Sequence, residues 1–131
     1  MQIVQKILKS FGEETEVDSE EKIELIGAIS GCGPAYFAFL TEIMESYALE
    51  HGLTEQQAKK IATTTFIGSA NLLKKSGWPV AELRAKITSK GGVTNAAITH
   101  LQDKGFDMIF KEALDSAIKR TKELNQLGNE S

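Results

Sequence analysis

The chain contains 131 residues, 41% hydrophobic and 25% charged, the proportions of a single globular domain that buries roughly two thirds of its unfolded surface. A formal net charge of −3 argues against the basic field that attracts nucleic acid or anionic lipid. No secretory leader and no apolar run approaching about 18 residues stands out, which predicts a soluble, cytoplasmic protein without a membrane segment. Cys32 is the only cysteine, so an internal disulfide is excluded.

The first expected elements are a helix and a short strand. "QIVQKILKSF" places its apolar residues on one helical stripe and is followed by glycine, a frequent helix stop. The acidic alternation of "EETEV", residues 13–17, indicates a short strand. The likeliest internal boundary lies near Asp18, because only helical patterns follow. This boundary divides the chain into residues 1–17 and 18–131.

The remaining sequence predicts helices from apolar residues at 3–4 spacing and from start and stop residues. Asp18 with Glu21 forms a capping-box pattern for the first helix, and Thr54 with Gln57 forms another. Residues after Gln126 are expected to fray. The fold class is therefore all-α, with six to seven helices and at most one strand. After the N-terminal piece, the expected helices span 19–29, 34–51, 55–75, 80–87, 94–101 and 106–126.

The helix expected at 34–51 has an unusually wide apolar surface. Its large apolar side chains cover more than one face, which indicates burial on several sides. Such a helix belongs either to the core of the domain or to an interface between subunits. The residues concerned are Tyr36, Phe37, Phe39, Leu40, Ile43, Met44 and Tyr47.

No metal site is expected. His51 and His100 are the only histidines, and neither has a second His or Cys at ligand spacing. His51 precedes Gly52 at an apparent helix end, where capping of the last carbonyls is the expected role. The chain also lacks the glycine-rich motifs that bind nucleotide phosphates.

The stretch "KITSKGGVTNAAITHL", residues 86–101, contains two adjacent glycines flanked by hydroxyl side chains. A loop of this kind before a helix can present successive N–H groups to a carboxylate or phosphate, with hydroxyls of Ser89 and Thr94 as further donors. In a simpler interpretation, Ser89 and Thr94 cap a helix while the glycines only turn the chain. The residues alone favour the simpler interpretation and leave both open.

A second glycine-containing stretch, "SGCGPAY", allows a similar pair of interpretations. It can bring backbone close to a flat ligand such as a cofactor ring, or it can be a hinge into a helix with proline in the first turn. Cys32 is better explained as a small packed side chain than as a nucleophile, because no His or Lys lies near it in sequence.

These two stretches together resemble the C-terminal domain of the pyrroline-5-carboxylate reductase family, which reduces 1-pyrroline-5-carboxylate to L-proline with NAD(P)H in proline biosynthesis. The resemblance covers roughly Glu14 to Leu124 without large gaps, and the Ser-x-Gly-Gly-x-Thr pattern of residues 89–94 is the family's signature. It implies a helical dimerisation and substrate-binding domain, in which two interlaced chains form a homodimer or a higher homo-oligomer and complete each active site.

The resemblance also implies roles for individual residues. Ser89 and the backbone around Gly92, Val93 and Thr94 would hold the substrate carboxylate, and the Thr94 hydroxyl would be catalytic, bonding the ring nitrogen as hydride arrives. The segment from Gly31 through Cys32 and Gly33 to Pro34 would lie near the nicotinamide of NADP or NAD.

The chain departs from the family pattern at several positions. Cys32 replaces the usual serine, Lys90 stands where proline is usual, and Ala85 and Lys86 replace an acid and an amide. The family's dinucleotide-binding Rossmann domain is missing, and residues 1–17 resemble its last helix and strand.

The chain is therefore expected to be a C-terminal portion of a reductase that binds no cofactor and is inactive in isolation. The alternative is a divergent, non-catalytic helical oligomerisation or interaction protein of the same fold. A nucleic-acid binder is disfavoured by the acidic charge balance.

Overall fold

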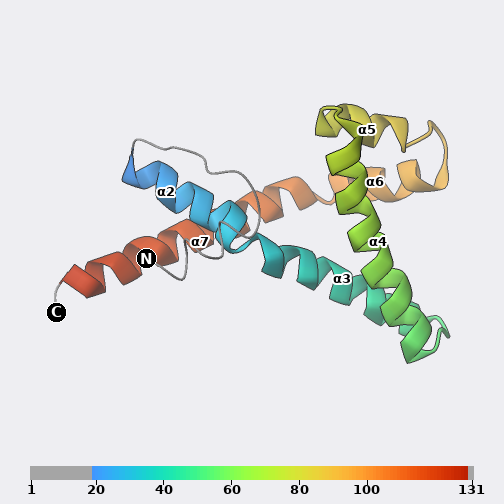
Figure 1. Cartoon of the computed structure of the whole chain (residues 1–131), viewed down its shortest axis with the longest axis horizontal. Coiled ribbons are helices and arrows are strands. Elements are labelled where there is room, and N and C mark those ends of the chain that lie inside the picture. The colour runs from blue at the N-terminus through green and yellow to red at the C-terminus, as the bar shows by residue number, and fades with distance from the viewer. Residues whose placement is uncertain (1–18, 130–131) are drawn as a thin grey trace. The chain divides into compact units, whose positions relative to one another are not determined.

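A computed structural model of the chain describes residues 19–129, and this range is helical, with no strand in it (Figure 1). The all-α prediction is confirmed for this part of the chain. The predicted helix at 2–11 and strand at 13–17 lie outside the described residues. The elements are α2 (Glu20–Ile26), η1 (Gly27–Gly31), α3 (Gly33–Glu50), α4 (Glu55–Ser76), α5 (Val80–Lys86), α6 (Val93–Asp103) and α7 (Phe106–Asn129).

The described residues form two compact units. One unit joins residues 19–36 to 105–129, and the other spans 37–104. The boundary between them falls within α3, so one helix contributes residues to both. The predicted boundary near Asp18 lies outside the described residues.

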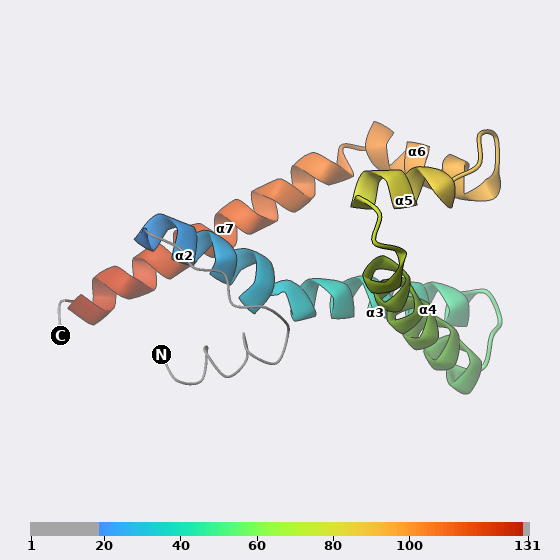
Figure 2. The ribbon, with the colours of Figure 1, turned by 45° about the horizontal axis from the view of Figure 1, so that its top comes forward.

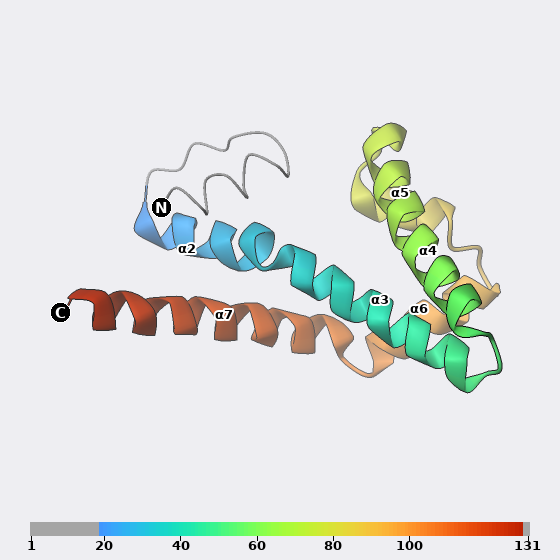
Figure 3. The ribbon, with the colours of Figure 1, turned by 60° about the horizontal axis from the view of Figure 1, so that its bottom comes forward.

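In the first unit, α7 lies alongside α2 and η1 (Figure 3). The ring of Tyr36 meets that of Phe110 edge to face, with 5.4 Å between centroids. Near the other end, the buried carboxylate of Glu24 pairs with the partly exposed ammonium of Lys122 at 3.7 Å. Because Glu24 is 8% exposed, this ion pair compensates a charge that would otherwise be costly to bury.

Two helix ends in this unit differ from the sequence prediction. The N-cap of α2 is Ser19, whose hydroxyl accepts from the N–H of Lys22 at 3.4 Å, in place of the predicted Asp18. Ser19 adopts the extended backbone that an N-cap requires. At the C-terminus, α7 continues to Asn129, past the predicted end at Gln126.

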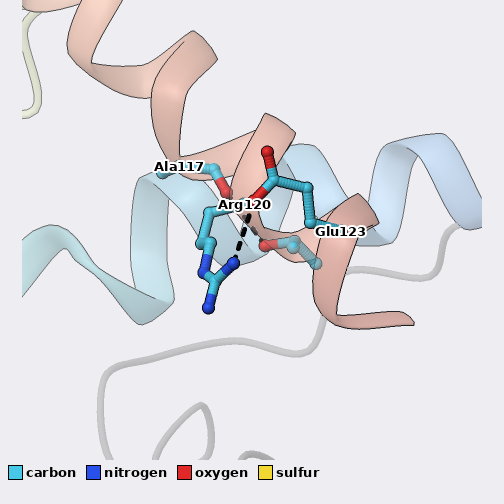
Figure 4. Close-up of polar contacts among 4 residues, drawn as sticks. Ala117, Arg120 and Glu123 are labelled. Atoms are coloured by element: carbon cyan, nitrogen blue, oxygen red, sulfur yellow. Dashed lines mark hydrogen bonds and ion pairs between the residues drawn. The ribbon is translucent and has the colours of Figure 1, made fainter. Parts of the chain in front are cut away.

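α7 carries polar contacts between its own residues, one exposed and one partly buried. Arg120 Nη1 lies 2.9 Å from Glu123 Oε2, and the Thr121 hydroxyl donates to the carbonyl of Ala117 at 3.0 Å (Figure 4). Both members of the ion pair are more than 40% exposed, so it contributes little to stability.

The hinge that we predicted at "SGCGP" is instead a π-helical turn that joins α2 to α3 without a break. The N–H of Cys32 donates to the carbonyl of Gly27 at 3.0 Å, five residues earlier. Pro34 has no N–H and cannot continue the regular ladder, and the wider turn before it accommodates the proline ring. The hydroxyl of Tyr36 donates to the carbonyl of Ala28 at 2.8 Å within this turn.

As a result, residues Glu20–Glu50 form one helical segment of 31 residues that is long and apolar enough, by length and composition alone, to cross a membrane. From the sequence we expected no apolar run approaching about 18 residues, and this segment differs from that expectation. Helices buried in cores or interfaces of soluble proteins meet the same criterion. Its exposed side chains include Ile29, Phe37, Phe39, Ile43 and Tyr47.

The second unit follows the predicted start and stop signals closely (Figure 2). After α3, Gly52 has φ 92°, and His51 Nδ1 lies 2.8 Å from the carbonyl of Tyr47, which confirms the capping role of His51. The capping box of Thr54 and Gln57 begins α4, as predicted.

Few side chains are buried by the single chain. Among the described residues, the buried hydrophobic side chains are those of Ala28, Ala58, Ala62 and Leu83, and no large side chain is fully buried. We predicted a core that takes up about two thirds of the unfolded surface. The described helices instead leave wide apolar faces exposed, and three of the four buried hydrophobic residues are alanines.

Candidate functional site

The loop singled out by the sequence begins at the end of α5. Leu83 anchors this helix, with only 4% of its surface exposed. The N–H of Ile87 donates to the carbonyl of Leu83 at 3.1 Å, and the N–H of Thr88 donates to that of Ala85 at 3.3 Å. The loop is therefore attached directly to the last turn of α5.

A tight turn then brings Ser89 and Gly92 together. The N–H of Gly92 donates to the carbonyl of Ser89 at 3.0 Å, and Gly91 adopts φ 74°, which only glycine reaches without strain. A Cβ on Gly92 would collide with the Ser89 hydroxyl and lie 3.1 Å from its carbonyl oxygen. Each glycine of the pair thus has its own physical requirement.

The first turn of α6 offers free donors. Gly92 is the N-cap, in extended backbone and without a side-chain cap, and its carbonyl accepts the first helical bond from Ala96 at 3.1 Å. The N–H groups of Val93, Thr94 and Asn95 therefore precede the helical ladder and lack acceptors within it. The simpler interpretation, in which Ser89 or Thr94 caps this helix, is wrong because glycine occupies the cap position.

The hydroxyls around the turn differ in exposure. Ser89 and Thr94 are exposed, as is Val93, which is 91% exposed. The Thr88 hydroxyl oxygen is buried without a hydrogen-bond partner in the described chain. The turn therefore presents three amides and two accessible hydroxyls at the positive end of a helix, an arrangement suited to a carboxylate or phosphate. The Gly92 amide is not among these donors, because it is engaged by Ser89.

The segment from Gly31 to Pro34 belongs to the other unit and has a different character. The N–H of Cys32 is bonded to Gly27, and its carbonyl accepts from the N–H groups of Ala35 and Tyr36 at 3.0 and 3.4 Å. The Cys32 side chain is exposed, whereas Gly33 is buried. A ligand here could contact the thiol and the helix surface, but the Cys32 backbone has no free hydrogen-bonding group.

Tyr36 links this segment to the packing beneath it. Burial of the phenol raises the pKa of Tyr36 above its ordinary value, and the electrostatic interaction and side-chain hydrogen bond with the neighbouring Cys32 raise it further. The phenol thus stays neutral and donates to Ala28.

Sequence reasoning missed two contacts near these segments. Tyr36 reaches Ala28, and Lys86 Nζ lies 4.5 Å from the centroid of the Trp78 ring. Both contacts span eight residues, across a helix junction in each case, and helical spacing rules of three and four residues do not reveal them. Between residues 19 and 129, no cluster of three or more His, Cys, Asp or Glu side chains could hold a metal ion.

Comparison with known proteins finds one family throughout. Residues 20–124 match the family described as pyrroline-5-carboxylate reductase dimerisation. The chain is 36% identical over 124 residues to a pyrroline-5-carboxylate reductase of Pseudomonas aeruginosa, covering 94% of this chain and 45% of that protein. It is 34% identical over 120 residues to pyrroline-5-carboxylate reductase 2 of Bacillus subtilis, covering 92% and 43% respectively.

Solved structures agree in fold. The reductase from Coxiella burnetii superimposes with a TM-score of 0.80 at 35% identity, covering 94% of this chain and 46% of that one. The Plasmodium falciparum enzyme, solved with NADP bound, gives 0.77 at 31% identity, with coverage of 93% and 49%. The chain therefore spans about half the length of the relatives that it matches.

Proposed function

We propose a function from one premise: the chain belongs to the family of pyrroline-5-carboxylate reductase dimerisation domains, which matches residues 20–124. It is the helical half of an NAD(P)H-dependent oxidoreductase that reduces 1-pyrroline-5-carboxylate to L-proline in the cytoplasm. It supplies the substrate loop and the subunit interface, and it is inactive without a dinucleotide-binding half. The observation that carries this proposal is the turn at 89–94 with its free amides and hydroxyls.

The substrate carboxylate binds at the start of α6 in this proposal. The amides of Val93, Thr94 and Asn95 and the hydroxyl of Ser89 donate to it, at the end of the helix where the dipole favours an anion. The Thr94 hydroxyl bonds the ring nitrogen and stabilises the developing amine as hydride reaches the neighbouring carbon. The role of the loop is positioning and polar stabilisation, with no covalent step.

The cofactor is NADP or NAD, held mainly outside this chain. A hydride donor must lie against the imine carbon, and the exposed edge at Gly31 and Cys32 is the surface this chain offers to a nicotinamide. An added Cβ on Gly31 meets no atom within 4 Å, so the surface is open for a flat ring. Because the N–H and the carbonyl of Cys32 are already hydrogen-bonded within the chain, the nicotinamide would make apolar contacts here and no hydrogen bonds to this backbone.

Self-association covers the apolar faces of the long helix. Phe39 and Tyr47 are each 62% exposed, and Phe37 stacks on Phe66 while remaining half exposed. Burial of each such side chain against a second copy stabilises the assembly by up to about 1.5–3 kcal/mol. This accounts for a helix apolar enough for a membrane in a protein that works in solution. A homodimer or a larger homo-oligomer follows.

Analytical ultracentrifugation of the purified chain at micromolar concentration tests the assembly. The chain should sediment as a dimer or larger species, and Phe39→Asp should shift it toward monomer. Far-UV circular dichroism of the variant controls for loss of helix. A wild-type chain that stays monomeric would contradict the proposed interface.

The catalytic proposal is tested by joining the chain to the N-terminal half of the Pseudomonas aeruginosa relative. The fusion should oxidise NADPH or NADH in the presence of 1-pyrroline-5-carboxylate. Thr94→Ala should lower kcat/KM by about 10²-fold or more, since it removes a donor to the reacting nitrogen. Thr99→Ala, on the same helix and also exposed, is the matched control and should retain activity.

Activity of the fused protein also distinguishes the proposed reductase function from the alternative, a non-catalytic oligomerisation protein. A fusion that folds and assembles but has no activity would favour a non-catalytic oligomerisation protein of the same fold. Equal activity of the Thr94→Ala and Thr99→Ala variants would contradict the assigned role of Thr94.

A further inference from the structure

Three side chains form a small cluster where α4 gives way to α5. The ammonium of Lys86 lies 4.5 Å from the centroid of the Trp78 ring and 3.7 Å from Glu82 Oε1. Trp78 precedes α5, Glu82 lies in its first turn and Lys86 is its last residue. The cluster therefore ties the end of α5 to the segment that enters it.

The helix held by this cluster needs outside support. α5 has only seven residues, too few for a helix that is stable by itself. Leu83 is its only buried residue, and its N-cap, Pro79, provides no side-chain cap. A single apolar anchor constrains the helix mainly at one point, so a second contact at the far end of α5 contributes to its orientation.

The loop at 87–92 depends on that orientation. The amides of Ile87 and Thr88 are bonded to carbonyls of α5, and the turn at Ser89 follows immediately. A change in the direction of α5 would therefore displace the turn and, with it, the first amides of α6.

We propose that Lys86, by stacking on Trp78 and pairing with Glu82, is a positioning residue that fixes the substrate loop. Its side chain stays outside the turn and acts only through the direction of α5. The effect on the loop is independent of the reaction, whereas its effect on catalysis rests on the proposed function.

The first experiment measures the loop directly in the 131-residue chain. Trp78 is the only tryptophan, so its fluorescence reports on the cluster alone. Lys86→Met removes the charge and keeps an extended apolar side chain. It should change the emission of Trp78 and speed amide hydrogen exchange at Leu83, Ile87 and Gly92 by about twofold to fivefold, the effect of losing an exposed cation–π contact.

Two variants make the result specific. Lys86→Arg keeps a cation over the ring and should restore wild-type exchange. Lys60→Met removes an exposed lysine from α4 and should leave both measurements unchanged. Wild-type exchange at Ile87 and Gly92 in the Lys86→Met variant would overturn the proposal, as would a failure of Lys86→Arg to restore the slower exchange.

A second experiment, in the fused reductase, asks whether the loop position matters to the substrate. Lys86→Met should raise KM for 1-pyrroline-5-carboxylate about twofold to fivefold with little change in kcat, because a displaced loop weakens carboxylate binding. Faster exchange with an unchanged KM would overturn the catalytic consequence. A fusion without activity would count against the proposed function and would leave the exchange result to decide the positioning role.

Discussion

Two glycine-containing segments precede helices in this chain, and their backbones have opposite properties. At 31–34 the helix passes through without interruption, and the backbone of Cys32 is fully hydrogen-bonded. At 89–94 the chain reverses at Gly91, and the next helix begins with unpaired amides. Glycine content alone is therefore a poor guide to ligand binding. The informative feature is which backbone groups are left without partners.

Substitution of Gly92 by alanine should give the largest effect and tests the loop side of this comparison. The new Cβ would collide with the Ser89 hydroxyl and lie 3.1 Å from the Ser89 carbonyl oxygen, so the hydroxyl must rotate away and the turn must shift slightly. We expect the free energy of unfolding to fall by about 1–3 kcal/mol, as for other overpacked sites. Urea denaturation followed by circular dichroism gives the value.

A second substitution sharpens the result. Adding Ser89→Ala to Gly92→Ala removes one of the two colliding groups and should recover part of the lost stability. A Gly92→Ala variant as stable as wild type would mean that the turn accommodates the added Cβ without loss of stability. The close approach of Gly92 to Ser89 would then be unimportant.

Replacement of Tyr36 by phenylalanine tests the other segment of the comparison, the continuous helix at 31–34. The carbonyl of Ala28 would lose the hydroxyl that donates to it, and the loss of one hydrogen bond should lower the free energy of unfolding by about 0.5–1.5 kcal/mol, as measured by urea denaturation.

The pH dependence of stability provides an independent check. The pKa of Tyr36 in the folded chain is raised above the ordinary 10.0 by burial and by Cys32. The folded state therefore retains the phenolic proton to higher pH than the unfolded state. This contribution to stability is complete below about pH 10 and is lost as the pH rises through the folded pKa. Wild type should lose stability above pH 10 more steeply than Tyr36→Phe. Parallel curves would contradict the assignment.

Gly31→Ala should have the smallest effect, and of opposite sign. No atom lies within 4 Å of the added Cβ, and the residue is helical with no positive φ. Alanine should stabilise the chain by about 0.5–1 kcal/mol, because it restricts the unfolded state and favours helix. Thermal denaturation of the Gly31→Ala and Gly92→Ala variants shows whether the first raises and the second lowers the melting temperature relative to wild type. A destabilised Gly31→Ala variant would remove the contrast between the two segments.

Sequence patterns predicted most helices because their signals are local. The Thr54–Gln57 capping box and the stop at Gly52 act within one turn, and the structure has them where expected. The π-helical turn was missed, since it depends on Pro34 and on a hydroxyl two residues later that reaches back to Ala28.

Composition and family resemblance both pointed to the loop at 89–94 as the candidate site, which stays a prediction, but neither specified the hydrogen bonds of its turn. The resemblance implied a role for the backbone around Gly92, Val93 and Thr94 without saying which groups donate, and the structure shows that the Gly92 amide closes the turn with Ser89. Turn hydrogen bonds depend on backbone angles that Gly-Gly leaves open, so the sequence could not decide between a capped and an uncapped α6.

The helix from Glu20 to Glu50 has a consequence for how this protein can be recombined. The border between the two compact units lies between Tyr36 and Phe37, inside a continuous helix. A recombination junction at this point would join helices from two different proteins in the middle of one continuous helix. The side chains on either side of the junction would have to keep their positions around the helix axis. Recombination, natural or designed, should therefore transfer the two units together.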